Sequence, residues 1–165
     1  MKYDEGPSVE VTIDVAAAPH AIWPVITDIN LPARFSDEFQ GASWCGAASG
    51  PAPGASFVGR NRHPAIGEWE TTCFVTECEP DRAFGWAVSD AAHPSATWTF
   101  GLEAHGDGTR VTFAMRMGPA RSGLNIAIDA MPDKEDRIIA RRLEEHQANM
   151  AETLAGIKAA VEQPR

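Results

Sequence analysis

The sequence has little of what usually reveals a function at once. Its 165 residues include three cysteines and a single tyrosine, and no window of about eighteen consecutive apolar residues occurs. The first residues lack the apolar stretch of a secretion signal. A small, odd number of cysteines provides no disulfide framework. These absences predict a cytoplasmic protein without a membrane-spanning helix.

Positive charge is also scarce. Lys and Arg total 14 against 23 Asp and Glu, which gives a net charge of −9. The densest basic group is Arg137, Arg141 and Arg142, but Glu144 and Glu145 are interleaved with it, as is typical of a solvated helix face. Because phosphates need a favourable positive field, we expect no nucleic-acid partner and no membrane insertion.

Recognisable catalytic and cofactor motifs are missing. The sequence has no nucleophile elbow, phosphate loop, dinucleotide fingerprint or pair of histidines at metal-binding spacing. Gly106 and Gly108 belong to a hairpin turn, because a predicted strand and not a helix follows them. Cys73 and Cys78 lie five apart in one predicted strand, and so on opposite faces, which favours free thiols over a shared metal. We therefore expect no cofactor and no metal.

The clearest positive feature is a long amphipathic helix over residues 133–162. Pro132 cannot continue an earlier helix, and Asp133 suits the N-cap position that follows it. Gly156 interrupts the pattern and marks either a close approach or a bend. A single polar residue lies in the apolar stripe, whose members recur at steps of three and four: Ile139, Leu143, His146, Met150, Leu154, Ile157 and Val161.

Seven short strands are predicted before this helix, some from alternating apolar and polar residues and others from the turn residues that separate them. Short helices are predicted over 19–29 and 31–39, after the first strand, and over 124–131 at one end of the sheet. Residues 1–7, which include Tyr3, are expected to fray. The prediction is an α+β fold in one domain, 1–165, with a curved antiparallel sheet wrapped around the terminal helix. The predicted strands are 9–15, 42–47, 55–62, 68–78, 83–89, 96–104 and 109–117.

The strand pattern places aromatic and methionine side chains on the face toward the helix. Such a surface is first of all a hydrophobic core, but a strongly curved sheet around one helix often keeps volume for an apolar ligand. Trp and Met suit the wall of a pocket, because the indole N–H is a directed donor and Met adapts its shape. The candidate ligand-binding residues are Trp69, Trp86, Trp98, Phe100, Phe113, Met115, His146 and Met150.

His146 is the one candidate for catalysis. Desolvation in an apolar stripe would keep its imidazole neutral, able both to donate and to accept a proton. The alternative is a structural histidine that hydrogen-bonds the sheet or touches water at the rim of a pocket. Other polar candidates are weaker, and each is expected on the surface or at the rim of an opening: Arg60, Arg62, His63, Glu68, Glu70 and Arg116.

The order of elements resembles a known architecture: one strand, two short helices, six strands and a long terminal helix. It is similar to the helix-grip fold of the START and birch-pollen-allergen superfamily, and more narrowly to its polyketide cyclase/dehydrase-like branch, often labelled SRPBCC. The resembling stretches are 9–15, 18–23 with Asp28, 82–86, 97–100 and 108–111. This resemblance implies an internal cavity for hydrophobic molecules such as lipids, sterols, quinones or polyketides, and in some members a cyclase activity.

Three functions stay open, because a fold of this kind does not fix one. The first is binding of a small hydrophobic molecule, lipid, polyketide or isoprenoid-like, between the sheet and the terminal helix. The second is a polyketide cyclase or dehydratase in which His146 moves a proton, although no motif matches a catalytic set and an interior tyrosine is missing. The third is a protein-interaction module that uses the outer face or an edge of the sheet. We expect a monomer or a homodimer.

Overall fold

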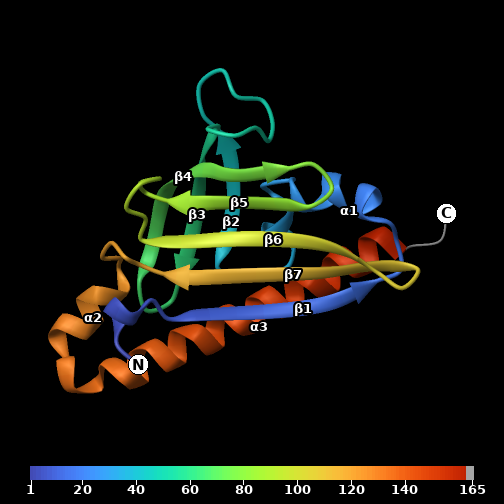
Figure 1. Cartoon of the computed structure of the whole chain (residues 1–165). Helices are drawn as coiled ribbons and strands as arrows, with labels where there is room; N and C mark the ends of the chain where they lie inside the picture. Colours follow the sequence, from blue (N-terminus) through green and yellow to red (C-terminus); the bar gives the residue numbers. More distant parts are fainter. Residues whose placement is uncertain (163–165) are drawn as a thin grey trace.

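The chain forms one antiparallel sheet that curls around a long helix (Figure 1). The computed structural model describes residues 1–162. In this part of the chain, none of the helices is both long and apolar enough to cross a membrane. Short 3₁₀ helices occupy Tyr3–Glu5, Leu31–Arg34 and Pro132–Lys134. The other elements are β1 (Ser8–Val15), α1 (Pro19–Ile26), β2 (Phe39–Trp44), β3 (Ser56–His63), β4 (Gly67–Glu79), β5 (Ala83–Val88), β6 (Ala96–His105), β7 (Gly108–Met117), α2 (Leu124–Ala130) and α3 (Glu135–Glu162).

The sheet is a meander whose first strand returns beside its last. The order is β1-β7-β6-β5-β4-β3-β2, and all neighbouring strands are antiparallel. Figure 1 shows β1 and β7 side by side along α3, with β2 and β3 at the far edge. The predicted α+β fold, with its seven-stranded sheet and long terminal helix, is confirmed.

The cross-strand register places the large aromatic side chains on the inner face of the sheet. Trp86 lies opposite Trp98, and Phe100 lies opposite Phe113. Residues opposite each other in an antiparallel pair share a face, so these aromatic residues form one row that faces the helix. Arg116 follows the same alternation and is exposed on the outer face, as predicted.

Helix α3 buries the predicted apolar stripe against the sheet. It begins two residues later than predicted, because Pro132–Lys134 form a 3₁₀ helix first. Asp133 lies inside that turn and does not cap α3. Each large apolar side chain buried in this way contributes about 1.5–3 kcal/mol. The buried members of the stripe are Ile139, His146, Met150, Leu154 and Ile157.

The second predicted helix, over 31–39, is wrong in length. Only Leu31–Arg34 are helical, and β2 begins at Phe39. Asn30 does not cap this turn through its side chain, and its Oδ1 accepts a hydrogen bond from the Ala42 N–H at 2.8 Å. The segment is therefore tied to the sheet edge as a turn.

Gly156 marks a close approach between α3 and this turn. A Cβ at Gly156 would overlap the ring of Phe35. Of the two readings that the sequence left open, a close approach and a bend, the structure supports the close approach. The glycine lets the helix sit directly on the segment that leads into β2.

The prediction that residues 1–7 fray is wrong. Tyr3 is buried, and its hydroxyl donates to the Ala120 carbonyl at 2.8 Å. The Tyr3 N–H donates to the Glu135 carboxylate at 2.9 Å. These bonds tie the N-terminal segment both to the loop after β7 and to the start of α3.

A bulge in β4 corrects the predicted placement of two cysteines. The register shifts between Val75 and Glu77, so Cys78 lies opposite the buried Phe84. Cys73 and Cys78 therefore both contact the core, and their predicted separation onto opposite faces is wrong. Cys45, Cys73 and Cys78 are all free thiols.

Candidate functional site

A cavity of about 490 Å³ lies between the inner face of the sheet and α3. This volume falls within the range of about 300–1,000 Å³ that is usual for small-molecule sites. The curved sheet and the helix therefore leave space that side chains do not fill. Every residue predicted to bind a ligand lines this cavity: Trp69, Trp86, Trp98, Phe100, Phe113, Met115, His146 and Met150. Their role in binding stays a prediction.

The sheet side of the cavity is a rigid aromatic wall. The rings of Trp86 and Trp98 are nearly parallel, with centroids 6.4 Å apart and planes at 11°. Phe100 and Phe113 stack at 4.0 Å and 8°. Stacked rings present large, flat apolar surfaces with little conformational freedom. Such a wall is complementary to a planar apolar molecule.

The helix side of the cavity carries a line of polar residues. Arg142, His146, Asn149 and Thr153 follow one another at steps of three and four and all line the cavity. Of this set, the sequence pattern predicts only His146 as a site residue. The others lie beside the apolar stripe, and polar residues repeating at helical spacing along that border were the signal that could have identified them.

His146 is buried and its ring faces the cavity. The side chain is 9% exposed, and the ring of Trp98 meets it edge-on at 5.2 Å and 84°. Burial, and secondly the charge of Arg142, lower the pKa of His146 to about 4. Among residues 1–162, neither ring nitrogen has a hydrogen-bond partner, and no fully enclosed polar atom is left unpaired. The imidazole is therefore neutral at pH 7 and open to a molecule in the cavity.

Further residues that line the cavity carry hydrogen-bond donors. The indole N–H groups of Trp69, Trp86 and Trp98 and the side-chain amide of Asn149 have no hydrogen-bond partner within the described chain. Fully enclosed donors normally find a partner, so these four side chains keep donors available for another molecule. The cavity thus combines apolar surfaces with a few donors that could fix the oxygen atoms of a ligand.

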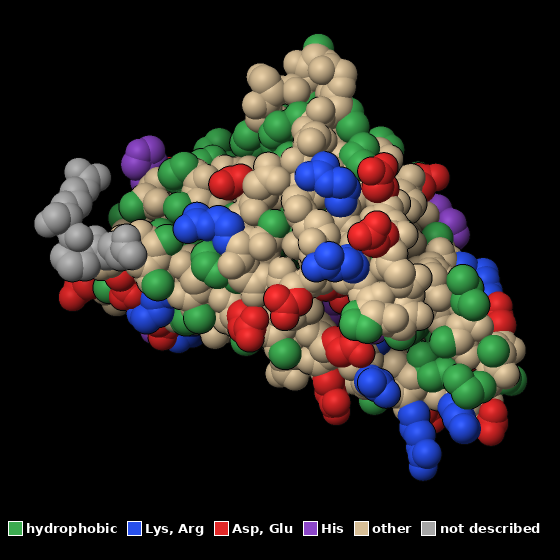
Figure 2. Space-filling model, turned by 180° about the vertical axis from the view of Figure 1, so that it is seen from behind, with side chains coloured by type: hydrophobic (Ala, Val, Ile, Leu, Met, Phe, Trp, Pro, Cys, Tyr) green, Lys and Arg blue, Asp and Glu red, His purple; other side chains and the backbone are tan. Residues whose placement is uncertain are grey.

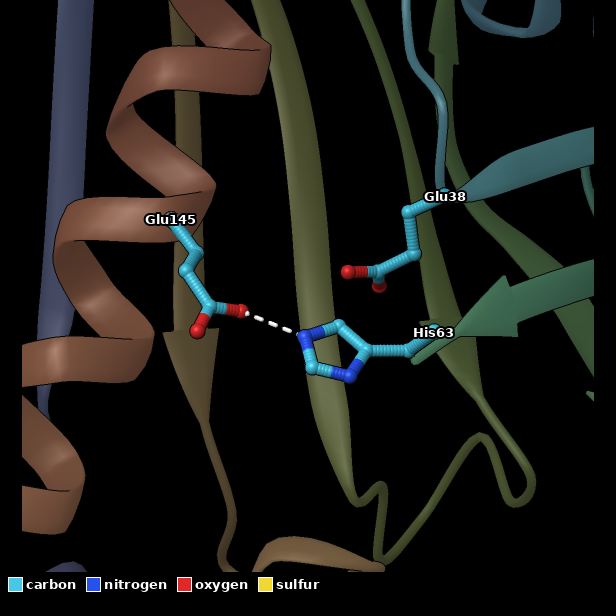
Figure 3. Close-up of side chains that lie close together, drawn as sticks. All are labelled: Glu38, His63 and Glu145. Atoms are coloured by element: carbon cyan, nitrogen blue, oxygen red, sulfur yellow. Dashed lines mark hydrogen bonds and ion pairs between the residues drawn. The ribbon is translucent and has the colours of Figure 1, made fainter. Parts of the chain in front are cut away.

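A network of charged side chains closes one side of the cavity. Arg142 donates to both oxygens of Glu38, at 2.8 and 2.6 Å, and to Glu145 at 2.8 Å. Nε2 of His63 lies 2.9 Å from Glu145, and Figure 3 shows the His63 ring pointing toward this carboxylate. These residues come from the loop before β2, the end of β3, and α3. The prediction that Arg142 belongs to a solvated helix face is therefore wrong.

The charges in this network stabilise one another. Burial opposes the charge of Arg142, but its bonds to Glu38 and Glu145 outweigh burial and raise its pKa. Burial raises the pKa of the Glu145 carboxyl, but hydrogen bonds from Arg142 and His63 outweigh it and hold the pKa below its usual value. The ion pair between Arg142 and Glu38 therefore joins α3 to the far edge of the sheet.

Three of these residues also have the spacing of a metal site, because ligand atoms of Glu38, His63 and Glu145 lie within 4.8 Å of one another (Figure 3). Nδ1 of His63 accepts a hydrogen bond from the Ala65 N–H at 3.0 Å. The proton of the neutral ring is then on Nε2, which donates it to Glu145. A metal at Nε2 would need that nitrogen deprotonated, and Arg142 already occupies both carboxylates. The donor set fits an ion-pair network better than a metal ion.

The remaining polar candidates lie outside the cavity wall. Arg60, Arg62, Glu68 and Glu70 are exposed and do not line the cavity. His63 is half-buried and bonded to Glu145, so it supports the rim and does not lie on the plain surface.

One end of the cavity lies at α2 and the turn between β3 and β4. Leu124 of α2 and Ile66 of the turn line the cavity, and Ile126 and Met131 near them are exposed. Hydrophobic side chains gather at this end of the molecule in the space-filling view, at its lower right (Figure 2). The predicted helix over 124–131 is confirmed as α2, and it covers this end of the cavity.

Comparisons with known proteins agree with this geometry. The sequence model described as "Polyketide cyclase / dehydrase and lipid transport" matches residues 6–162. A polyketide-cyclase-like protein of Corynebacterium glutamicum, Cgl2372, is 29% identical, with 95% of this chain and 92% of that chain covered and a TM-score of 0.67. A search of curated proteins finds no match.

More distant solved structures share the fold. The di-domain ARO/CYC protein BexL of the BE-7585A biosynthetic pathway is 15% identical, with a TM-score of 0.71 over 97% of this chain. This chain covers 51% of BexL. Ara h 8.0201 is 10% identical, with 94% of this chain and 97% of that chain covered and a TM-score of 0.58. At these identities the likeness concerns the fold alone.

Proposed function

Because the chain belongs to the polyketide cyclase/dehydrase and lipid transport family, we propose that it binds a small, planar hydrophobic molecule with oxygen acceptors along one edge. The contrast between the two walls of the cavity carries this proposal. Stacked rings on the sheet side support a flat apolar face. Unpartnered donors on the other side, from His146 and Asn149, support recognition of carbonyl or hydroxyl oxygens. A ring-containing polyketide or isoprenoid fits this pattern better than a plain acyl chain.

A cavity-filling substitution tests this function. Ala96 lines the cavity from β6, so Ala96→Phe places a ring inside it. Ala114 is half-buried on the outer face of β7, and Ala114→Phe is the matched control. Binding of the fluorescent apolar probe phenylnaphthylamine should weaken by about tenfold or more in Ala96→Phe and stay unchanged in Ala114→Phe. Native mass spectrometry of the purified protein would also measure the mass of any ligand that co-purifies with it. Equal affinity in both variants would contradict the proposal.

The second candidate function is a cyclase-type reaction that uses His146. The open nitrogens of a neutral imidazole favour it. His146 would take a proton from a carbon between two carbonyls, the carbanion would add to another carbonyl of the same molecule, and the imidazolium would return the proton to the new alkoxide. A base of pKa about 4 is weak at pH 7, because general bases work best with a pKa near the operating pH. Binding therefore stays the first proposal.

Turnover of polyketide mimics decides between the two functions. If His146 is the base, His146→Ala should abolish cyclisation, and binding of the same mimic should remain. Cyclisation at an unchanged rate in His146→Ala would remove His146 from the reaction. If the unaltered protein binds the mimics without any turnover, the result would contradict the cyclase function and support the binding function.

A further inference from the structure

The positive charges in the described cavity wall are already paired. Its basic side chains are Arg121 and Arg142. Arg121 pairs with Asp129, and Arg142 pairs with Glu38 and Glu145. Arg121 and Asp129 are 64% and 61% exposed, so solvent screens that pair, whereas Arg142, the cation of the wall that is mostly removed from water, already has two carboxylate partners.

Two acidic side chains lie in the wall itself. Asp28 and Glu38 both line the cavity; Asp28 is exposed, and within residues 1–162 its carboxylate accepts one hydrogen bond, from the Asn30 N–H at 3.0 Å. Counted with the carboxylates that pair the arginines, four acidic groups stand against two guanidinium groups around this volume. The chain as a whole carries a net charge of −9. The local field and the overall field both oppose anions.

Arg142 cannot turn easily toward a ligand. Its Nη1 donates to Glu38 and to Glu145, and its Nη2 donates to the second oxygen of Glu38. The side chain is 12% exposed and is held by partners from two segments of the chain. Two carboxylates therefore already balance the charge of this guanidinium group, so a carboxylate in the cavity would compete with Glu38 for it.

We propose that the cavity selects uncharged ligands over anions, and that Glu38 is the residue that sets this selectivity. The inference rests on the proposed binding function and specifies its ligand class: neutral ketones, alcohols and quinone-like molecules, and not free fatty acids or other carboxylates. An anion would lose its hydration in an apolar cavity and gain no unpaired cation in return.

Two probes with the same ring system test this selectivity. Anilinonaphthalene sulfonate is an anion, and phenylnaphthylamine is its uncharged parent. Fluorescence titration of the unaltered protein should give an affinity about tenfold or more higher for the uncharged probe. Glu38→Gln removes one negative charge at nearly constant shape and leaves an amide oxygen for Arg142. In this variant the affinity for the sulfonate should rise about tenfold relative to the affinity for phenylnaphthylamine.

Glu144→Gln is the matched control, because Glu144 lies on α3 next to the network, is exposed and does not line the cavity. It should leave both affinities unchanged. Equal affinity of both probes for the unaltered protein, or equal effects of the Glu38 and Glu144 substitutions, would overturn the inference and leave the binding function standing. Failure of both probes to bind would overturn the binding function as well.

Binding of phenylnaphthylamine also reports whether each variant is folded. If Glu38→Gln no longer binds phenylnaphthylamine, the affinity of Glu145→Gln for the sulfonate tests the inference instead. That substitution removes a charge from the same network through a side chain outside the cavity wall. A rise in sulfonate affinity supports the inference, and no rise overturns it.

Discussion

Replacing Arg142 with methionine tests the network that joins α3 to the far edge of the sheet. Methionine keeps most of the volume of the arginine stem and removes the charge. Glu38 and Glu145 then remain close together without their shared partner. Both carboxylates are also partly removed from water, so the protein should lose stability.

The structure sets the size of this loss. The Arg142 side chain is 12% exposed, and those of Glu38 and Glu145 are 15% and 31% exposed. Removing one partner of a buried ion pair costs about 3–5 kcal/mol, whereas exposed pairs contribute about 0–1 kcal/mol. Because these carboxylates keep some contact with water, we expect about 3 kcal/mol. For a chain of this length that corresponds to a fall in Tm of about 6–12 °C.

The loss should depend on pH. Hydrogen bonds from Arg142 and His63 outweigh burial and hold the pKa of Glu145 below its usual 4.5. A carboxyl with a lowered folded-state pKa stabilises the fold above its unfolded pKa, and this contribution disappears as the pH falls through the folded value. In Arg142→Met, Glu145 loses one of the hydrogen bonds that hold its pKa down, so it protonates more readily. The difference in unfolding free energy between the two proteins should therefore narrow below about pH 4.5.

Urea unfolding at pH 7 and at acid pH measures both effects. The control is Arg141→Met, because Arg141 is 85% exposed and lies 3.7 Å from the same Glu145. The control should change the unfolding free energy by less than about 0.5 kcal/mol. A loss below about 1 kcal/mol in Arg142→Met at pH 7, or equal losses in the two variants, would refute this reasoning.

Three further predictions concern single residues. Gly156→Ala should lower the unfolding free energy by about 1–3 kcal/mol in urea, because the new methyl group overlaps Phe35; a gain of about 1 kcal/mol, as expected from helix propensity alone, would contradict the close approach. An NMR titration should give His146 a pKa of about 4, below its usual 6.5. The unfolded chain binds more protons between these values, so unfolding free energy should fall by about 3 kcal/mol as the pH drops through this range. His146→Gln should remove that part of the pH dependence, and a pKa near 6.5 would contradict the burial. Burial raises the pKa of the Cys73 thiol to about 11, so iodoacetamide should modify Cys45 before Cys73 when followed by mass spectrometry, and equal rates would contradict this.

Local periodicity was enough to predict the main architecture. The spacing of Ile139, Met150 and Ile157 is a property of neighbouring turns of one helix, and the alternation around Trp98 is a property of one strand. Neither of these two patterns depends on contacts with segments that are distant in the sequence. For the same reason the aromatic wall of the cavity could be predicted residue by residue, although the open volume could not.

The parts that were missed depend on contacts between distant segments. Arg142 and Glu38 are 104 residues apart, and Tyr3 and Ala120 are 117 apart. Near Arg142 the sequence shows only an ordinary alternation of charges, which is also the pattern of a solvated helix face. The bulge in β4 likewise has no glycine or proline to mark it, so the strand was read as regular.

The central claim is that a neutral apolar molecule enters the cavity between the sheet and α3. Indole N–H signals in a heteronuclear NMR titration with phenylnaphthylamine test it most directly. Trp86 and Trp98 line the cavity, whereas Trp23 and Trp44 do not. The account predicts saturable shifts of the Trp86 and Trp98 signals, with those of Trp23 and Trp44 unchanged. Shifts confined to Trp23 and Trp44, or no shifts at all, would contradict it.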